Sequence, residues 1–175
     1  MIITLNIDGE ERKFDLNDGR LTTVNKEPEE VEVKTGYERL GLMERYYMTD
    51  GTSQPETYHP EDTKRYENAD YFASPTLAAD VARAQEIWRK LLRWQAENDA
   101  PDDWENDAID HYYIYYNYYN KTFHVGELHF WRDAFNVYFS TVEKAEQALE
   151  IFREDLTWLF TEFQYRLDGT AGEGE

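Results

Sequence analysis

The chain has 175 residues, and its 37 acidic against 18 basic side chains give a formal charge of −19. A chain of this length buries roughly 70% of its unfolded surface, so one domain, or two small units sharing a core, can fold without a disulfide or metal. Cysteine is absent, which excludes a disulfide scaffold, a thiolate zinc site and a cysteine nucleophile. The negative charge disfavours nucleic acid and anionic membranes as direct partners and favours a basic protein surface. The same charge would also keep an abundant protein soluble.

The first residues lack the basic start and the long apolar run of a signal peptide. No stretch approaches the roughly 18 apolar residues that a membrane span needs. We therefore expect a cytoplasmic location, in a host cell, and no membrane partner.

Residues 1–16 have the pattern of a β-hairpin. Ile3, Leu5 and Ile7 alternate with polar residues, and Asp8-Gly9 is a typical hairpin turn. Two further short strands are expected at 21–24 and 31–34. These elements predict an N-terminal β-hairpin module over residues 1–36.

Two later segments, 37–98 and 111–167, resemble copies of one unit. Each begins with a tyrosine pair, Tyr46-Tyr47 or Tyr112-Tyr113, and each reaches a Tyr-Phe pair before a helical pattern. The Tyr-Phe pairs start at Tyr71 and Tyr138, 67 residues apart. The pattern predicts two related strand-then-helix units. The alternative is that unrelated units with a strand, a cap and a helix share such features.

The predicted fold is α+β, with antiparallel strands and two long helices. The first helix is expected from about 75 to 97, with Ser74 as its N-cap and Pro75 at the first helical position. The second is expected to begin near Thr141, where Ser140 and Glu143 have the spacing of a capping box. A break near Glu154-Asp155 would divide it into two shorter helices.

The second helical segment carries an apolar seam with alternating spacings of three and four residues. Such a seam can bind a partner helix or a second copy of the chain, which predicts a possible homodimer, or it can face the chain's own core. The acidic tail, 168–175, is expected to be disordered. The residues of the seam are Val142, Ala145, Leu149, Phe152, Leu156, Leu159 and Phe163.

An acidic linker at 99–110 joins the two units. The stretch from Glu97 to Asp110 holds seven acids and no lysine or arginine. Unpaired carboxylates are costly to bury, so we expect them to face water or a cationic partner. The candidate partner-binding residues here are Asp99, Asp102, Asp103, Trp104, Glu105, Asp107 and Asp110.

Six of the eight residues from Tyr112 to Tyr119 are tyrosine. In a strand, Tyr113, Tyr115 and Tyr119 lie on one face, and Tyr112, Ile114, Tyr116 and Tyr118 lie on the other. One face can pack into the core while the other meets a partner, for which tyrosine is well suited. We therefore add Tyr113, Tyr115 and Tyr119 to the candidate binding residues. The alternative is that the tyrosines stabilise the sheet through cross-strand pairs.

No catalytic residue, metal ligand or cofactor-binding motif is predicted, so we do not expect an enzyme. Asp50, Asp62 and Lys64 have the order of a metal-dependent nuclease site, but the residues around Asp62 do not form a hydrophobic strand pattern. Asp103, Glu105 and Asp107 start like a calcium loop that lacks its glycine. His124 and His129 would point to opposite faces of a strand.

The aromatic and cap pattern from about residue 45 to 156 resembles a loose family of small uncharacterised proteins from tailed phages and prophages. The residues that carry this resemblance include Arg45-Tyr46-Tyr47 with Asp50-Gly51, Tyr71-Phe72-Ala73-Ser74, Trp104, Tyr112–Tyr116 and Val137–Ser140. The resemblance implies a mobile-element origin and an accessory role. It identifies no functional residue.

Together, charge and resemblance predict a stoichiometric inhibitor of a host defence enzyme that handles nucleic acid. A restriction or CRISPR effector has a basic channel that an acidic protein can occupy as a DNA mimic. The alternative is a structural or assembly protein of a virion or replication complex that uses the apolar helix seam.

Overall fold

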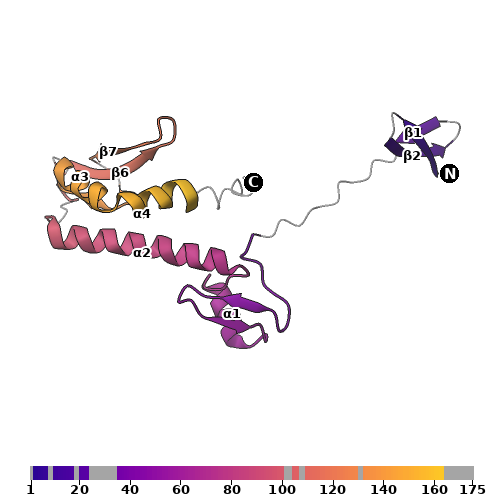
Figure 1. Cartoon of the computed structure of the whole chain (residues 1–175), viewed down its shortest axis with the longest axis horizontal. Coiled ribbons are helices and arrows are strands. Elements are labelled where there is room, and N and C mark those ends of the chain that lie inside the picture. Colours follow the sequence, from indigo (N-terminus) through magenta and orange to yellow (C-terminus); the bar gives the residue numbers. More distant parts are fainter. Residues whose placement is uncertain are drawn as a thin grey trace. The chain divides into compact units, whose positions relative to one another are not determined.

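The computed structural model describes residues 2–7, 10–17, 20–23, 35–100, 104–106, 109–129 and 132–163. The chain divides into two compact units, Met1–Thr35 and Gly36–Glu175 (Figure 1). Three features expected from sequence lie outside the described residues: the short strand at 31–34, much of the acidic linker, and the tail at 168–175.

The first unit is a three-stranded antiparallel sheet. Its strands are β1 (Ile2–Ile7), β2 (Glu10–Asn17) and β3 (Arg20–Thr23), in the order β1-β2-β3. The register pairs Ile2 with Asp15 and Phe14 with Thr23. The predicted hairpin is therefore confirmed, and the strand expected at 21–24 adds to it as the third strand.

The second unit contains strands and helices, which confirms the α+β prediction. None of its described helices is long and apolar enough to cross a membrane. In chain order the elements are β4 (Arg45–Tyr47), β5 (Ser53–Pro55), α1 (Pro60–Glu67), α2 (Pro75–Asn98), β6 (His111–Asn117), β7 (Thr122–Leu128), β8 (Tyr138–Phe139), α3 (Val142–Ile151), α4 (Arg153–Trp158) and the π-helix η1 (Leu159–Phe163).

The second unit contains the same strand order twice. In the first repeat, residues 45–98, the β4–β5 hairpin is followed by an antiparallel bridge from Phe72 to Tyr47 and then by α2. In the second repeat, residues 111–163, the β6–β7 hairpin is followed by β8, which pairs Phe139 with Tyr112, and then by α3. The predicted order of strands leading into a helix is thus confirmed. The matching bridges make Tyr47 equivalent to Tyr112 and Phe72 equivalent to Phe139.

The N-caps of α2 and α3 lie at corresponding positions of the two repeats, and one cap predicted from the sequence is wrong. The Ser74 hydroxyl accepts a hydrogen bond from the Leu77 N–H at 3.3 Å, as predicted for the N-cap of α2. The N-cap of α3 is Thr141, whose hydroxyl accepts from the Lys144 N–H at 3.2 Å. The capping box predicted at Ser140 is wrong, because Ser140 donates its N–H and its hydroxyl to Asp99 instead.

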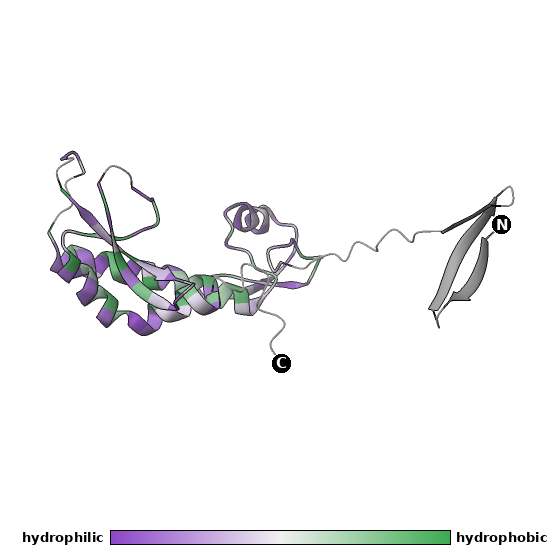
Figure 2. Ribbon diagram, turned by 90° about the horizontal axis from the view of Figure 1, so that it is seen from above, coloured by the Kyte–Doolittle hydropathy of each residue, from purple (hydrophilic) through white to green (hydrophobic). Residues whose placement is uncertain are grey.

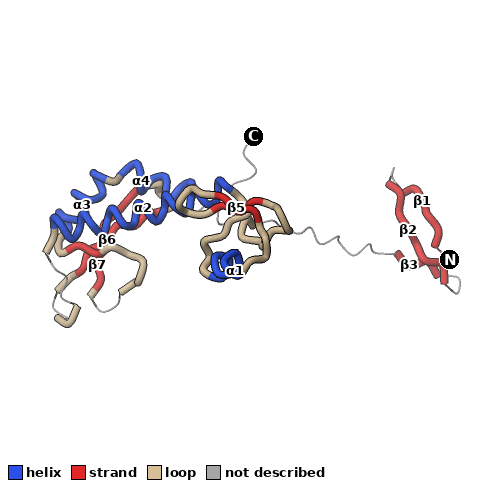
Figure 3. The backbone as a smooth tube through the Cα atoms, turned by 90° about the horizontal axis from the view of Figure 1, so that it is seen from below, coloured by secondary structure: helices blue, strands red, loops and turns tan. Residues whose placement is uncertain are grey.

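The main core lies between the helices and one face of the β7-β6-β8 sheet. Helices α3 and α4 run alongside α2 (Figure 1, Figure 3). Hydrophilic and hydrophobic residues both occur along these helices (Figure 2). Its buried residues are Ile87, Leu91, Phe139, Ala145, Ala148, Leu149, Leu156 and Trp158.

The apolar seam of the second helical segment faces this core. Ala145, Leu149 and Leu156 are buried there, whereas Val142 at the start of α3 remains exposed. The helix breaks at Phe152, two residues before the predicted break, and continues as α4. A homodimer through the seam would therefore compete with the chain's own core packing.

Candidate functional site

Strand β6 presents alternate tyrosines to opposite faces of its sheet. Tyr112 and Ile114 pack against the core, and Tyr116 stacks on Phe160 of η1 with ring centroids 6.2 Å apart. Tyr113 and Tyr115 lie on the other face, as predicted from the period of two. The strand ends at Asn117, so Tyr118 and Tyr119 belong to the following turn.

The face opposite the core carries a continuous set of aromatic rings, which we call the aromatic row. Tyr138 is 6.0 Å from Tyr113, Tyr113 is 5.8 Å from Tyr115, and Tyr115 is 5.5 Å from His124 between ring centroids. Helix α3 packs against β6, β7 and β8 on the core side of this sheet, so the aromatic row lies on the side away from α3. The aromatic row consists of Trp104, His111, Tyr113, Tyr115, His124 and Tyr138.

Trp104 closes one end of the aromatic row. Its ring stacks on His111 at 3.7 Å with an angle of 9°, and it meets Tyr138 edge-on at 4.9 Å. Arg132 lies over the Trp104 ring at 5.5 Å. Trp104 was predicted as an anchor for a partner, but it is partly buried because it packs on the chain's own sheet.

The other end of the aromatic row is open to solvent. The exposed fraction of Tyr115 is 37%, and Tyr113 and His124 are partly exposed. His124 Nε2 lies 2.9 Å from the Thr122 hydroxyl and 3.2 Å from the Asn120 amide, contacts that fix the orientation of its ring. The open end therefore presents several neighbouring aromatic rings to solvent, and the orientation of the His124 ring among them is fixed by hydrogen bonds.

Two of the predicted linker acids serve the fold. Asp99 accepts the Ser140 N–H at 2.9 Å and also the Ser140 hydroxyl, which ties the end of α2 to the start of α3. Asp110 lies 2.7 Å from His129 Nδ1 and 3.4 Å from the Tyr112 hydroxyl. Burial, followed by the charge of Asp110, raises the pKa of Tyr112. Among the described residues, these carboxylates are engaged by serine, tyrosine and histidine and not by lysine or arginine.

The remaining predicted residues divide into three groups. Glu105 is exposed. Asp102, Asp103 and Asp107 lie outside the described residues. Tyr119 is 97% exposed in the turn after β6 and makes no ring contact within the described residues, so it does not join the aromatic row.

Sequence reasoning missed three members of the aromatic row: His111, His124 and Tyr138. The signals were present, because the period that selects Tyr113 and Tyr115 also selects His111. The pairing of the Tyr-Phe segment with β6 places Tyr138 opposite Tyr113. His124 lies opposite Tyr115 in β7.

An exposed acidic stripe on α3 and α4 was also missed. Glu143, Glu146 and Glu150 recur every three or four residues, which places them on one side of α3. Glu154 follows in the first turn of α4. Glu150 pairs with Arg153 at 3.0 Å, and the other three make no ion pair within the described residues. Because the core lies on the opposite side of α3, this stripe and the aromatic row are on different sides of the sheet.

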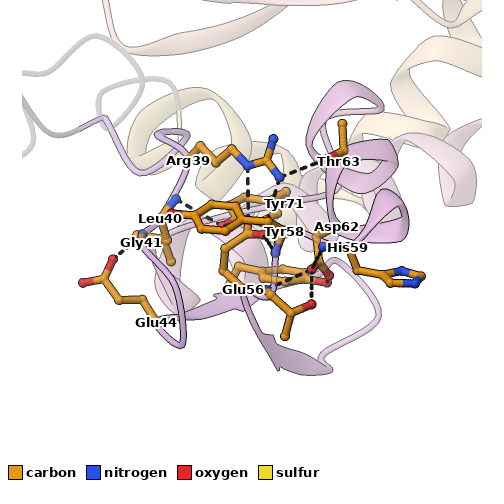
Figure 4. A network of polar contacts seen from close by, with 12 residues as sticks. Arg39, Leu40, Gly41, Glu44, Glu56, Tyr58, His59, Asp62, Thr63 and Tyr71 are labelled. Atoms are coloured by element: carbon orange, nitrogen blue, oxygen red, sulfur yellow. Dashed lines mark hydrogen bonds and ion pairs between the residues drawn. The ribbon is translucent and has the colours of Figure 1, made fainter.

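The first repeat contains two buried carboxylates that support its fold (Figure 4). Asp62 accepts hydrogen bonds from Thr57 Oγ1 at 2.7 Å, Tyr46 Oη at 2.8 Å and the backbone N–H groups of Thr57 and His59. These bonds, the Thr57 hydroxyl first, lower the pKa of Asp62 to about 2 against the opposing effect of burial. Asp62 is therefore occupied by protein donors, which removes it from the nuclease-like pattern noted in the sequence.

Glu56 is the second of these carboxylates and is fully buried. It accepts from the Tyr71 hydroxyl at 2.8 Å and the Tyr58 N–H at 2.7 Å, and it pairs with Arg39 at 3.3 Å. Burial alone would raise the pKa of Glu56, but these three donors outweigh it and hold the pKa below its usual value. The pair of carboxylates fixes the loop from Glu56 to His59, where Tyr58 has a positive φ of 56°.

Comparison with known proteins adds no family to these observations, since no family model, curated protein or solved structure matches the chain. Within the described ranges, no three His, Asp or Glu side chains gather as a metal site requires. The aromatic row is therefore the strongest candidate for a functional surface.

Proposed function

We propose that this chain works by stoichiometric binding to another protein, with the open end of the aromatic row as the contact surface. The observation that carries this proposal is the row of touching rings on a sheet face, with Tyr115 and Tyr113 accessible. Tyrosine offers a large, rigid contact area and a polar hydroxyl, which is why it is enriched in the energetically dominant parts of interfaces.

The chemistry of the chain favours a basic partner. The net charge of −19 attracts cationic surfaces and accelerates their association. Aromatic faces bind arginine and lysine through cation–π contacts. Stacking on nucleic-acid bases is disfavoured, since such platforms normally lie in positively charged grooves.

The partner we favour is a host enzyme with a basic nucleic-acid channel, such as a restriction or CRISPR effector. The acidic stripe on α3 and α4 would meet a different wall of the channel from the aromatic row, because the two lie on different sides of the sheet. It supports this choice, since helix residues three or four apart have Cβ atoms roughly 5–6 Å apart. Such a stripe presents closely spaced negative charges, as a phosphate backbone does. The chain would act in the host cytoplasm by competing with nucleic acid for the channel, as a phage-type accessory protein.

Capture followed by competition tests this proposal. The tagged full chain is used as bait in host extract, and the captured enzyme is purified and titrated with the chain. We expect duplex DNA to displace the chain, and affinity to fall steeply between about 50 and 200 mM salt. A captured enzyme that binds DNA and the chain together would contradict the proposal.

A second candidate is an assembly role, favoured by an apolar groove beside α2. Trp88, Leu91, Phe160 and Phe135 are among its lining residues, and Phe135 is 83% exposed. The Trp88 indole N–H donates to the Phe135 carbonyl at 3.1 Å, which holds the exposed loop against α2. An assembly contact here would be insensitive to salt and would be weakened by Phe135→Ser, whereas the DNA-competition result would be unchanged by that substitution.

A further inference from the structure

The two repeats can be compared residue by residue on the outer face of their sheets. The bridge from Tyr47 to Phe72 matches the pair Tyr112 and Phe139. Both pairings are antiparallel, so the neighbouring residues also correspond. Three residues of the first repeat, Tyr46, Met48 and Tyr71, are therefore equivalent to His111, Tyr113 and Tyr138 in the second.

In the first repeat, helix α1 covers this outer face. Asp62 accepts from the Tyr46 hydroxyl at 2.8 Å, Arg65 contacts the Met48 sulfur, and Tyr66 meets Tyr71 edge-on at 5.5 Å. The three helix residues are spaced i, i+3 and i+4, so they share one side of α1. The residues beneath them, Tyr46, Met48 and Tyr71, are at most 2% exposed.

In the second repeat, Trp104 provides only part of this cover. The described residues between β7 and β8 contain no helix. Trp104 stacks on His111 and meets Tyr138, which are 1% and 2% exposed, so it takes the places of Asp62 and Tyr66. Tyr113 remains partly exposed. Among the described residues, the rings that lie against Tyr113 are those of Tyr115 and Tyr138, and none of these residues places a cation at the position equivalent to that of Arg65.

We propose that this position receives an arginine that the partner presents on a short helix, as α1 presents Arg65 in the first repeat. This inference rests on the proposed function and specifies how the partner binds. The position over Tyr113 suits a guanidinium, because tyrosine rings attract cations and arginine is the residue most often found on them. Tyr115 adds a second ring at 5.8 Å, and the −19 charge of the chain favours a cationic group there.

The test uses the full chain and a stapled helical peptide with the sequence of residues 59–68. In the peptide, Glu61, Asp62, Tyr66 and Glu67 are replaced by alanine. This removes the charge repulsion and the two side chains, Asp62 and Tyr66, whose places Trp104 fills. Nuclear magnetic resonance follows the side chains of Tyr113, Tyr115 and His124 during titration. We expect saturable binding with shifts at these rings, and about tenfold weaker binding for the peptide carrying Arg65→Gln, in keeping with a cation–π contact.

Chain variants complete the design. Tyr113→Leu and, as a second variant in case the first misfolds, Tyr115→Leu should each weaken peptide binding about tenfold, by the same contact. Tyr119→Ala is the matched control, because this tyrosine is exposed but lies outside the aromatic row. Absence of binding, equal binding of the Arg65→Gln peptide, or shifts confined to the backbone of β7 would each overturn the inference. The proposed function fails on a different result, the simultaneous binding of DNA and the chain by the captured enzyme.

Discussion

The ring of Tyr113 lies directly against Gly126 of the neighbouring strand. A Cβ built at residue 126 would lie 2.8 Å from Cε1 and Cζ of that ring, closer than such atoms approach in proteins. Glycine is therefore required here for close packing, since it leaves room for the Tyr113 ring against β7. The open end of the aromatic row depends on this arrangement.

Gly126→Ala should displace the Tyr113 ring and weaken binding of the basic partner. Overpacking of this kind typically costs about 1–3 kcal/mol of stability. Urea unfolding measures the cost, and titration with the partner measures the loss of affinity. In a Tyr113→Ala background the same glycine substitution should cost little, because the clashing ring is gone. Equal costs in both backgrounds would show that the glycine serves another purpose.

Asp62→Asn should destabilise the first repeat and reduce its sensitivity to acid. The pKa of Asp62 is lowered from 3.8 to about 2. The carboxylate therefore contributes stability that is present above about pH 4 and is lost as the pH falls towards about 2, a contribution of about 2 kcal/mol. Unfolding measured at pH 7 and pH 2 tests this, because the contribution is largely lost only near the folded pKa. The variant should lose stability mainly at pH 7, and an equal loss at both values would refute the assignment.

Asp99→Ala should lower stability without affecting the salt dependence of partner binding. Its carboxylate holds two groups of Ser140, and loss of charge-assisted hydrogen bonds costs about 1.5–3 kcal/mol. Thermal unfolding and partner titration measure the two effects separately. Ser140→Ala is the matched variant and should lose less, because its backbone N–H still donates. A weaker salt dependence in Asp99→Ala would instead place this acid in the interface.

Charge reversal on α3 should affect mainly the association with a basic partner and only slightly the stability of the fold. Glu143→Lys with Glu146→Lys changes two exposed carboxylates. Because Glu143 lies in the first turn of α3, where the helix dipole favours an acid, stability should fall by up to about 1 kcal/mol, less than in Asp99→Ala. The association rate with a basic partner should fall, since long-range attraction acts mainly on that rate. Stopped-flow mixing at low salt gives the rate. An unchanged rate would exclude the acidic stripe from partner recognition.

The elements that sequence predicted well are those whose signals are local. Helical spacing of apolar residues predicted α2, and Ser74-Pro75 marks its start. The apolar stripe was predicted only in part: Leu91 is buried, but Trp88 is 39% exposed and the buried Ile87 was not included. The predicted stripe was Leu77, Val81, Ala84, Trp88 and Leu91, with Trp94 as an optional last member. The period of two in β6 correctly divided Tyr112 from Tyr113. Local periodicity reports which side of an element is apolar, and this does not depend on distant contacts.

The features that sequence missed depend on contacts between distant residues. Helix α1 has a very polar sequence and was not predicted; its buried Asp62 is held by Tyr46 and Thr57. Ser140 loses its predicted capping role because Asp99, 41 residues earlier, accepts its donors. For the same reason two linker acids predicted at the interface, Asp99 and Asp110, are engaged in the fold, since charge patterns do not reveal such partners.

The central claim is that the chain binds a basic partner through Tyr113 and Tyr115. Calorimetric titration of the captured enzyme with the wild-type chain, the Tyr113→Ala/Tyr115→Ala variant and the Tyr119→Ala control tests it most directly. We expect a 1:1 complex whose affinity falls at least about a hundredfold in the double variant, as loss of two interface anchors of about 1.5 kcal/mol each implies. The control should bind like wild type. Equal affinity of all three chains would contradict the claim.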